Sequence, residues 1–274
     1  MSTYTQWTAD DAAQHIAVPA EYDDKYSRGV LGVITGSDQY PGAAVLGVEA
    51  ALHTGVGMVR YLGTSKPSEL VLQRRPEAVT SDGRVQAWLL GSGMDHAVHE
   101  NASFARMSEA LAQALPTILD GGALDMHATA RGPVVVTPHL GELARVLGVP
   151  RLLIAAAPAT WARKAADDLG VTVLLKGHTT YIAGPGISLS TSSAPTWLVT
   201  AGAGDALAGI LGALIATHAD DAAADETALA RLAATAAVLH GLAAHRAGAG
   251  GPLTILGLCA ALPATVAALV GGLS

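Results

Sequence analysis

The segment Leu198–Leu214 (LVTAGAGDALAGILGAL) joins an acidic side chain to a glycine-rich turn and an apolar run. The turn, Ala201–Gly204, carries almost no side chains, so its backbone N–H groups can approach an anion closely. The helix expected from Ala206 onward would direct its positive end at that turn. Asp205 could then act as a base beside a phosphoryl group. It could equally cap the helix, since Asp is a favoured cap residue, and the local pattern leaves both interpretations open.

Length, composition and charge bound the class of protein. The chain has 274 residues, of which 50% are hydrophobic and 14% charged, enough for one large core or at most two small domains. A net charge of −7 without a Lys/Arg cluster argues against nucleic acid as the main partner. A small anionic ligand remains compatible with this charge, because one local turn can bind it.

Compartment signals predict a soluble, cytoplasmic protein with no membrane partner. The single cysteine, Cys259, excludes an intrachain disulfide framework and fits a reducing compartment. Residues 1–11 have neither the basic nor the apolar region of a signal peptide. The uncharged stretch Pro252–Ser274 is long enough to span a bilayer. Pro263 and the many small residues in it favour a buried terminal helix instead.

Short apolar runs alternate with Ala-rich segments of helical length, and this alternation predicts one α/β domain with a parallel sheet covered on both faces. The expected strands are Gly29–Thr35, Gly57–Leu62, Ala87–Leu90, Thr117–Leu119, Pro133–Val136 and Val171–Leu175. The expected helices are Gly42–Leu52, Glu100–Ala114, Gly141–Leu147, Thr160–Leu169, Ala228–Ala247, Thr254–Val270 and the one after Asp205. Thr179–Leu189 is predicted to form a β-hairpin, and Ala219–Thr227 a surface loop.

Glycine and polar residues follow most of the expected strands. In open α/β sheets ligands bind beyond the carboxyl ends of the strands, so these loops would meet at one edge. The loops are 36–44 (GSDQYPGAA), 91–94 (GSGM), 120–122 (DGG), 137–142 (TPHLGE) and 176–180 (KGHTT). Each loop alone could be ordinary turn chemistry, but their shared position predicts a ligand site.

Two side chains in these loops are candidate ligand contacts. His139 follows a proline and is either a fixed ligand donor or acceptor or a helix-start residue. Lys176 ends an apolar strand before a glycine, which favours a phosphate or nucleotide contact over a solvated lysine. The histidines at 53, 240 and 245 lack a partner at metal-ligand spacing and are interpreted as structural or surface residues. The chain contains no G-x-S-x-G, CxxC, HExxH or Walker A sequence.

Together these motifs resemble those of the ribokinase-like NAD(P)H-hydrate dehydratases, which repair hydrated NADH and NADPH. The resemblance covers about Trp7 to Val270. It is carried by Lys25–Gly29 (KYSRG), Tyr40–Leu46 (YPGAAVL), Thr137–Glu142, Lys176–Thr180 and Thr200–Asp205 (TAGAGD). YPGAAVL and TPHLGE are specific, whereas GAGD is shared with sugar and vitamin kinases. The resemblance implies a three-layer α/β sandwich with a mainly parallel central sheet and helices on both faces.

The resemblance also implies a reaction and a role for each site residue. The ring hydroxyl of the hydrated nicotinamide would be phosphorylated by ADP or ATP, and loss of phosphate would regenerate the reduced cofactor. Mg²⁺ would bridge the phosphates, with no side chain here assigned to it. Asp205 would be the base, and the backbone at Gly202, Ala203 and Gly204 would form an anion hole. Lys176, Gly177, His178, Thr179, Thr180 and Gly204 would bind the nucleotide, and Ala43, Gly93, His139 and Asp205 the hydrate.

The chain departs from the family pattern at several positions. Gly122 replaces the second acid of an Asp-Ala-Asp-Ala-Leu motif, which puts any role of that acid in doubt. Ala203 stands where Ser or Thr is usual, and 195–197 (PTW) replaces Asn-Pro-Gly. About 24 residues precede Lys25, so we expect the N-terminal epimerase module of many relatives, and its activity, to be missing. The family tends to form homo-oligomers, which implies one here, with a tetramer as one arrangement.

Two other functions stay open at this level. A small-molecule kinase of the same fold, acting on a thiazole or pyrimidine vitamin precursor, would share the GAGD turn. A catalytically inactive nucleotide-binding protein would explain the changes at Gly122 and Ala203.

Overall fold

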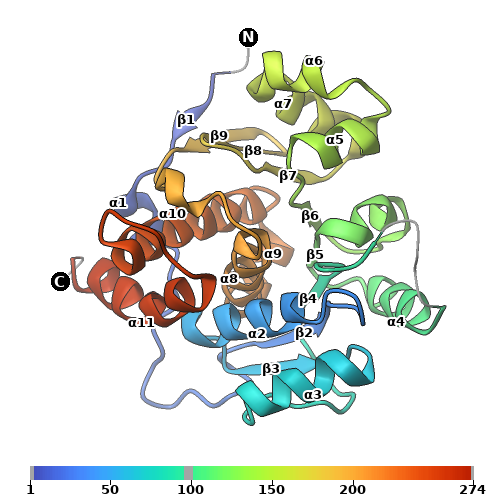
Figure 1. Cartoon of the computed structure of the whole chain (residues 1–274), viewed down its shortest axis with the longest axis vertical. Coiled ribbons are helices and arrows are strands. Elements are labelled where there is room, and N and C mark those ends of the chain that lie inside the picture. The colour runs from blue at the N-terminus through green and yellow to red at the C-terminus, as the bar shows by residue number, and fades with distance from the viewer. Residues whose placement is uncertain (1–2, 96–100, 273–274) are drawn as a thin grey trace.

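The computed structural model describes residues 3–95 and 101–272, with the side chain of Asn101 left aside (Figure 1). Its strands are β1 (Thr5–Gln6), β2 (Val30–Ile34), β3 (Met58–Tyr61), β4 (Ala87–Leu90), β5 (Thr117–Leu119), β6 (Val134–Val136), β7 (Thr172–Leu175), β8 (Thr180–Gly184) and β9 (Ile187–Thr191). They form one nine-stranded sheet in the order β1-β9-β8-β7-β6-β5-β4-β2-β3. All neighbours pair in parallel except β7 with β8 and β8 with β9. The predicted mainly parallel sheet and the hairpin are confirmed.

Helices cover both faces of this sheet. They are α1 (Ala9–Ala13), α2 (Gly42–Thr54), α3 (Ser65–Arg74), α4 (Asn101–Leu111), α5 (Leu140–Leu147), α6 (Arg151–Ala156), α7 (Pro158–Leu169), α8 (Ala203–Thr217), α9 (Ala219–Ala224), α10 (Ala228–Gly248) and α11 (Ile255–Gly271). Two 3₁₀ segments, η1 (Gly121–Thr129) and η2 (Thr196–Leu198), follow β5 and precede α8. In Figure 1, α2, α8, α10 and α11 gather on one side of the sheet, and α4, α5 and α7 lie on the other.

Alternation along the strands builds two cores, one on each face. Strand residues such as Leu31, Leu89 and Leu174 pack with α2, α8, α10 and α11, whereas their neighbours Val30 and Leu90 pack with the opposite helices. Successive strand residues point to opposite faces, so a strand buried on both sides must be apolar throughout. The five residues of β2 and the four of β4 are all buried. The expected three-layer arrangement is therefore confirmed.

Most expected elements appear within a few residues of their predicted bounds, but the surface loop predicted at Ala219–Thr227 is wrong. Its first part is the helix α9, because an alanine-rich run has high helix propensity and Asp220 and Asp221 favour the positive end of a helix. Ala222 packs into the core. The sequence interpretation also missed β1, α1, α3 and α6. Glu100, the predicted start of α4, lies outside the described residues.

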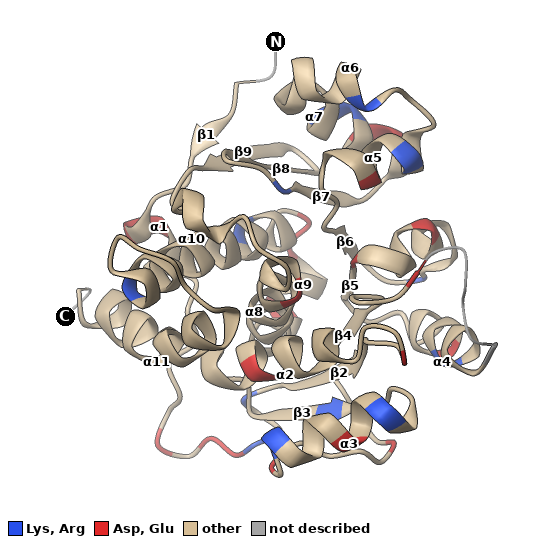
Figure 2. Cartoon of the chain, in the orientation of Figure 1, with Lys and Arg blue, Asp and Glu red and all other residues tan. Residues whose placement is uncertain are grey.

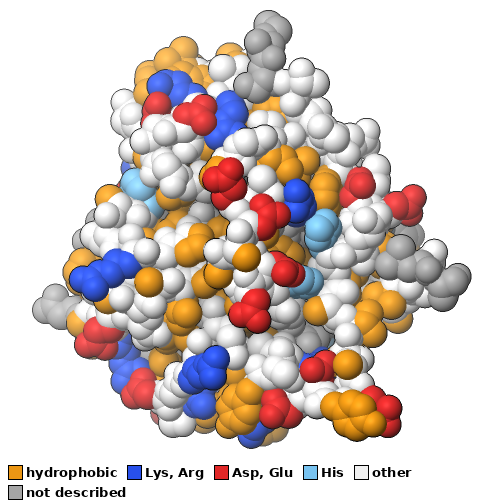
Figure 3. Space-filling model, turned by 180° about the vertical axis from the view of Figure 1, so that it is seen from behind, with side chains coloured by type: hydrophobic (Ala, Val, Ile, Leu, Met, Phe, Trp, Pro, Cys, Tyr) orange, Lys and Arg blue, Asp and Glu red, His pale blue; other side chains and the backbone are white. Residues whose placement is uncertain are grey.

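The longest apolar helix is buried inside the fold, whereas the surface carries charged and apolar side chains together. Among the described helices, α10 alone is long and apolar enough to cross a membrane by length and composition, and 83% of its most apolar window is buried inside the fold. The uncharged terminal stretch forms α11, which packs against α10 and α2 (Figure 2). On the face seen in Figure 3, acidic and basic side chains alternate with apolar ones.

Helices α2 and α8 approach each other through glycine. A Cβ added to Gly209 would lie 2.2 Å from the carbonyl oxygen of Gly47, so only glycine fits at this crossing. A Cβ added to Gly47 would lie 3.6 Å from the carbonyl oxygen of Asp205. The contact therefore holds the start of α8, which carries Asp205, against the first turns of α2, which carry Ala43.

We predict that Gly209→Ala lowers the free energy of unfolding by about 1–3 kcal/mol, the usual range for overpacking, although alanine is the better helix former. The matched control is Gly271→Ala, where an added Cβ meets nothing within 4 Å; we expect it to stay within about 0.5 kcal/mol of the parent. Chemical denaturation of both variants measures the difference. Equal stability of the two variants would contradict a helix contact that only glycine permits.

Candidate active site

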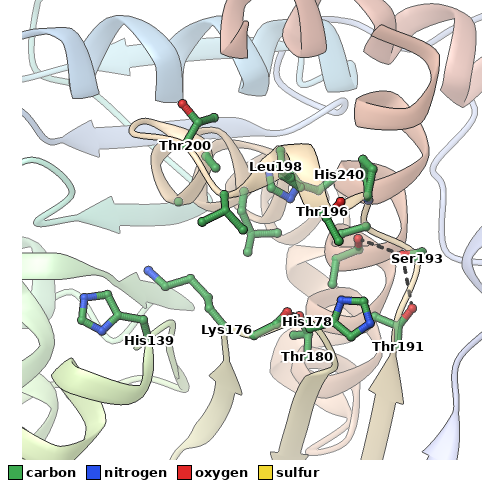
Figure 4. Close-up of a pocket in the computed structure, with 18 of the residues that line it drawn as sticks. His139, Lys176, His178, Thr180, Thr191, Ser193, Thr196, Leu198, Thr200 and His240 are labelled. Carbon is green, nitrogen blue, oxygen red and sulfur yellow. Dashed lines mark hydrogen bonds between the residues drawn. The ribbon is translucent and has the colours of Figure 1, made fainter. Parts of the chain in front are cut away.

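A cavity of about 900 Å³ opens at the carboxyl end of β7. Three walls surround it. The first is formed by His139 and by the loop after β7, and the second by the segment 191–204 (Figure 4). The third wall belongs to α10, through Ala237 and His240. The cavity therefore lies at the strand ends, where the sequence predicted a ligand site. Its lining includes four of the predicted nucleotide residues in the loop 176–180, namely Lys176, Gly177, His178 and Thr180.

The glycine-rich turn forms the start of α8. Gly202 is the residue before the helix and has a left-handed conformation with φ of 89°. A Cβ there would lie 2.4 Å from Leu46 Cδ1 and would displace that side chain, but it is the left-handed backbone that calls for glycine. Ala203 and Gly204 line the cavity. The first N–H groups of a helix have no partner within the helix, so this turn presents donors and a positive dipole end to an anion.

Asp205 does not cap its own helix. The residue before α8 is Gly202, and no side chain makes a cap hydrogen bond there. The carboxyl is instead half-buried, and burial is the main cause that raises its pKa to about 7. The negative charges of Asp120 and Glu142 raise it further, and Lys176 opposes them. A carboxyl whose pKa lies near neutrality is suited to act as a general base.

Lys176 lies between acidic side chains and the turn. Its Nζ donates to Asp120 Oδ1 at 2.9 Å and lies 3.7 Å from Glu142 Oε2. The same Nζ is 3.3 Å from the point where a Cβ on Gly204 would sit. Burial acts to lower the pKa of Lys176, but the neighbouring carboxylates hold it above its ordinary value. The site therefore carries a permanent cation next to the turn.

His139 proves to be both a helix-start residue and a wall of the cavity. Its Nδ1 accepts hydrogen bonds from the backbone N–H groups of Gly141, at 3.0 Å, and Glu142, at 3.1 Å. The Glu142 carboxylate accepts in return from the backbone N–H of His139 at 2.8 Å, which completes a capping box. Since Nδ1 is an acceptor here, the neutral ring carries its proton on Nε2. That N–H remains able to donate to a ligand.

Ala43 and Gly93 lie together, but outside the cavity lining. A Cβ on Gly93 would lie 2.2 Å from Ala43 Cβ, and Gly93 has a left-handed backbone. Thr179 is also outside the lining, and its hydroxyl contacts Ser192 Oγ at 2.9 Å. Asp205 and Gly202 complete the set of predicted residues that the lining does not include. Of the predicted hydrate residues, Ala43 and Gly93 therefore lie together outside the cavity lining, whereas His139 lines the cavity with most of the nucleotide residues.

Two residues that sequence reasoning left without a role belong to this region. Asp120 follows β5, is 4% exposed, and accepts from Thr137 Oγ1 at 2.7 Å as well as from Lys176. His240 was interpreted as structural or surface, but it lines the cavity, and burial lowers its pKa to about 4. A signal for Asp120 was present, because this acid directly follows an apolar strand run. For His240 only the packing of α10 reveals the position.

The departures from the family pattern have local structural counterparts. A Cβ on Gly122 would lie 2.8 Å from the Met94 carbonyl oxygen, so the chain here leaves no room for a side chain at this position. Ala203 leaves the turn without a hydroxyl beside the cavity. The replaced segment leads into η2, and Pro195 and Thr196 lie in the cavity lining.

The comparisons with known proteins agree on one family. A family model described as NAD(P)H-hydrate dehydratase matches residues 31–255. The bifunctional NAD(P)H-hydrate repair enzyme Nnr of Mycobacterium tuberculosis is 42% identical over 226 residues, covering 76% of this chain and 45% of the relative. The ADP-dependent (S)-NAD(P)H-hydrate dehydratase of Bacillus subtilis is 30% identical over 233 residues, covering 78% of this chain and 82% of the relative. The chain thus spans about half the length of its bifunctional relatives.

Solved structures show the same fold. The ADP/ATP-dependent NAD(P)H-hydrate dehydratase from Bacillus subtilis, co-crystallised with ATP and Mg²⁺, superposes with a TM-score of 0.85 at 25% identity, covering 98% of this chain and 100% of that one. A ribokinase-like superfamily protein from Enterococcus faecalis reaches 0.83 at 22% identity, covering 97% and 96%. The fold is therefore ribokinase-like, and with the family match over most of its length the chain belongs to the NAD(P)H-hydrate dehydratases.

Proposed function

We propose that this chain catalyses the ADP-dependent dehydration of hydrated NADH and NADPH, with ATP as the other candidate nucleotide. The observation that carries the proposal is the half-buried carboxyl of Asp205, whose pKa is raised to about 7 beside an anion-binding helix start and a fixed lysine. A base with that pKa is substantially available in its deprotonated form near pH 7 and is more basic than an ordinary carboxylate, which suits general base catalysis. The family match supplies the substrate class.

The cavity suits an adenine nucleotide with its phosphates near the α8 turn. Its walls combine apolar groups, such as Leu198 and Leu207, with Lys176 and the backbone at Gly204. Apolar walls suit a purine, and the cation and helix start suit phosphates. In residues 3–95 and 101–272 no group of three or more His, Cys, Asp or Glu side chains is placed to hold a metal ion. We propose that Mg²⁺ enters with the nucleotide and neutralises phosphate charge, in keeping with the Bacillus subtilis dehydratase that was co-crystallised with ATP and Mg²⁺.

The proposed reaction runs in two steps on the hydrated ring. Asp205 accepts the proton of the ring hydroxyl, and the hydroxyl oxygen attacks the terminal phosphoryl group, releasing AMP when ADP is used. The charge that develops on the transferring group meets Lys176 and the N–H groups of the α8 turn. Phosphate then departs with its bonding electron pair, the neighbouring ring carbon loses a proton, and the ring double bond returns. Hydroxide is a poor leaving group and phosphate a good one, which explains the need for a nucleotide.

The hydrate would lie at the start of α2. Ala43 and Gly93 are small and packed against each other, so neither presents a bulky side chain to a dinucleotide bound there. His139 would donate from Nε2 to the substrate. Because Ala203 has no hydroxyl, backbone N–H groups and Lys176 would carry the stabilisation that a Ser or Thr shares in relatives.

We further propose that the chain acts as a single dehydratase domain in a cytoplasmic homo-oligomer.

The first prediction from the proposed function concerns the reaction itself. Incubation with hydrated NADH or NADPH, Mg²⁺ and ADP should restore the near-ultraviolet absorbance of the reduced cofactor and release AMP and phosphate. ATP is tested in parallel. If neither nucleotide supports recovery while a thiazole or pyrimidine alcohol is phosphorylated, the chain is a vitamin-precursor kinase. If nucleotide binds without turnover of any of these substrates, the inactive-homologue function holds instead.

The second prediction concerns Asp205. Asp205→Asn should lower kcat by about 10²- to 10⁴-fold, the usual contribution of a general base, with nucleotide binding retained. In the parent, the base works only when deprotonated, so kcat/KM should fall about tenfold per pH unit below the pKa of about 7. Steady-state kinetics across pH, with nucleotide affinity measured by calorimetry, checks both parts. Full activity of the variant, or a flat profile through pH 7, would exclude Asp205 as the base.

The third prediction separates the two roles of His139. His139→Asn retains a good cap residue but loses the Nε2 donor, whereas His139→Ala loses both. Both variants should raise the KM for the hydrate, and only the alanine variant should lose about 1 kcal/mol of stability. Thr254→Ala is the matched control, because Thr254 Oγ1 caps α11 by accepting from the Gly257 N–H at 3.1 Å. It should lose similar stability with an unchanged KM, and a parallel rise in KM there would assign the effect to helix fraying.

A further inference from the structure

The carboxyl ends of three adjacent strands hold a buried polar cluster. β5, β6 and β7 pair in parallel and are followed by Asp120, Thr137 and Lys176 respectively. One carboxylate oxygen, Asp120 Oδ1, accepts from both Thr137 Oγ1, at 2.7 Å, and Lys176 Nζ, at 2.9 Å. Thr137 is 1% exposed and Asp120 4%. The carboxylate is therefore fixed from one side and directed toward the ammonium from the other.

We propose that Asp120 is a positioning residue of the dehydratase, which holds the Lys176 ammonium against the α8 turn so that it meets the transferring phosphoryl group. The inference deepens the proposed function and rests on it. Asp120 is not assigned contact with the substrate or nucleotide, and acts through Lys176.

The geometry explains why Lys176 needs such a partner. A lysine side chain is a flexible stem with a point charge, and its position is set by what it binds. Glu142 Oε2, at 3.7 Å, is the competing carboxylate, and that side chain is already engaged in the capping box with His139. The shorter contact to Asp120 keeps Nζ 3.3 Å from the Cβ point of Gly204. A glycine at 204 lets the ammonium approach the turn this closely.

Asp120 has a second effect, on the charge of the proposed base. The charged groups acting on Asp205 come from the β5 end (Asp120), the β7 end (Lys176) and α5 (Glu142). From α2, Leu46 and Gly47 lie next to the start of α8 that carries Asp205, and neither of these residues has a titratable side chain. After burial, the Asp120 charge is the largest cause that raises the pKa of Asp205. Removing that charge should lower the pKa of Asp205.

The test compares Asp120→Asn with Asp125→Asn. The Asp120→Asn variant keeps the shape of the side chain but loses its charge, so kcat should fall about 10- to 100-fold, as for a misplaced catalytic group, while the KM for ADP changes less. The acid limb of the kcat/KM profile should move to lower pH. Asp125 pairs with Arg145 on the surface and serves as the control with unchanged kinetics. Parent-like kcat in Asp120→Asn, or an acid limb that stays in place, would overturn the inference.

A milder variant guards against loss of folding. Thr137→Val removes the hydrogen bond from Thr137 Oγ1 to Asp120 and should lower kcat in the same direction by a smaller factor. Thr117→Val is its control, because Thr117 is equally buried but bonds to the Leu115 carbonyl at the opposite end of β5. Equal kcat in Thr137→Val and Thr117→Val would count against the positioning role.

An activity-independent measurement separates this inference from the proposed function. The carboxyl carbon of Asp205 is titrated by ¹³C NMR in the parent and in Asp120→Asn, with Asp205→Asn giving the assignment. A lower pKa in Asp120→Asn supports the inference, and an unchanged one overturns it. If the parent does not turn over the hydrate, the proposed function fails, and the titration still reports whether Asp120 controls Asp205.

Discussion

The ion pair between the partly buried Lys176 and the buried Asp120 is the interaction on which the rest of the site depends. A buried ammonium is costly unless it is paired and hydrogen-bonded. Asp120 meets that requirement at 2.9 Å, and Thr137 fixes Asp120 in turn. The pair sets a positive charge beside the α8 turn and a negative charge within reach of Asp205. The lysine keeps its charge, and the half-buried aspartate gains a pKa near neutrality.

The fold supplies this pair by bringing strand ends together. β5 and β7 are separated by more than fifty residues of sequence but by only one strand, β6, in the sheet. Parallel pairing brings every carboxyl end to the same edge, so short loops suffice to build a site. The rest of the site, Asp205 and the turn at the start of α8, is positioned by a contact between helices, because α8 must lie against α2. The close approach of Gly209 to Gly47 provides it.

Much of the fold and part of the site could be predicted from local pattern. Continuous apolar runs such as Ala87–Leu90 identified the central strands, because a strand buried on both faces has no polar positions. The α9 segment was misassigned because its acidic residues suggested solvent, whereas they begin a short helix that packs Ala222 into the core. Whether Asp205 caps its helix was left open, since the answer depends on where Gly202 starts α8.

The sequence by itself determined the layer order, the strand-end loops and the family to which the chain belongs, because these follow from hydrophobic periodicity and from short motifs within single loops. Only the tertiary structure decided which side chains meet. It paired Asp120 with Lys176, placed His240 on the cavity wall, and set Ala43 beside Gly93 outside the cavity lining. Contacts between residues far apart in the chain depend on sheet order and helix packing, which no local window of sequence contains.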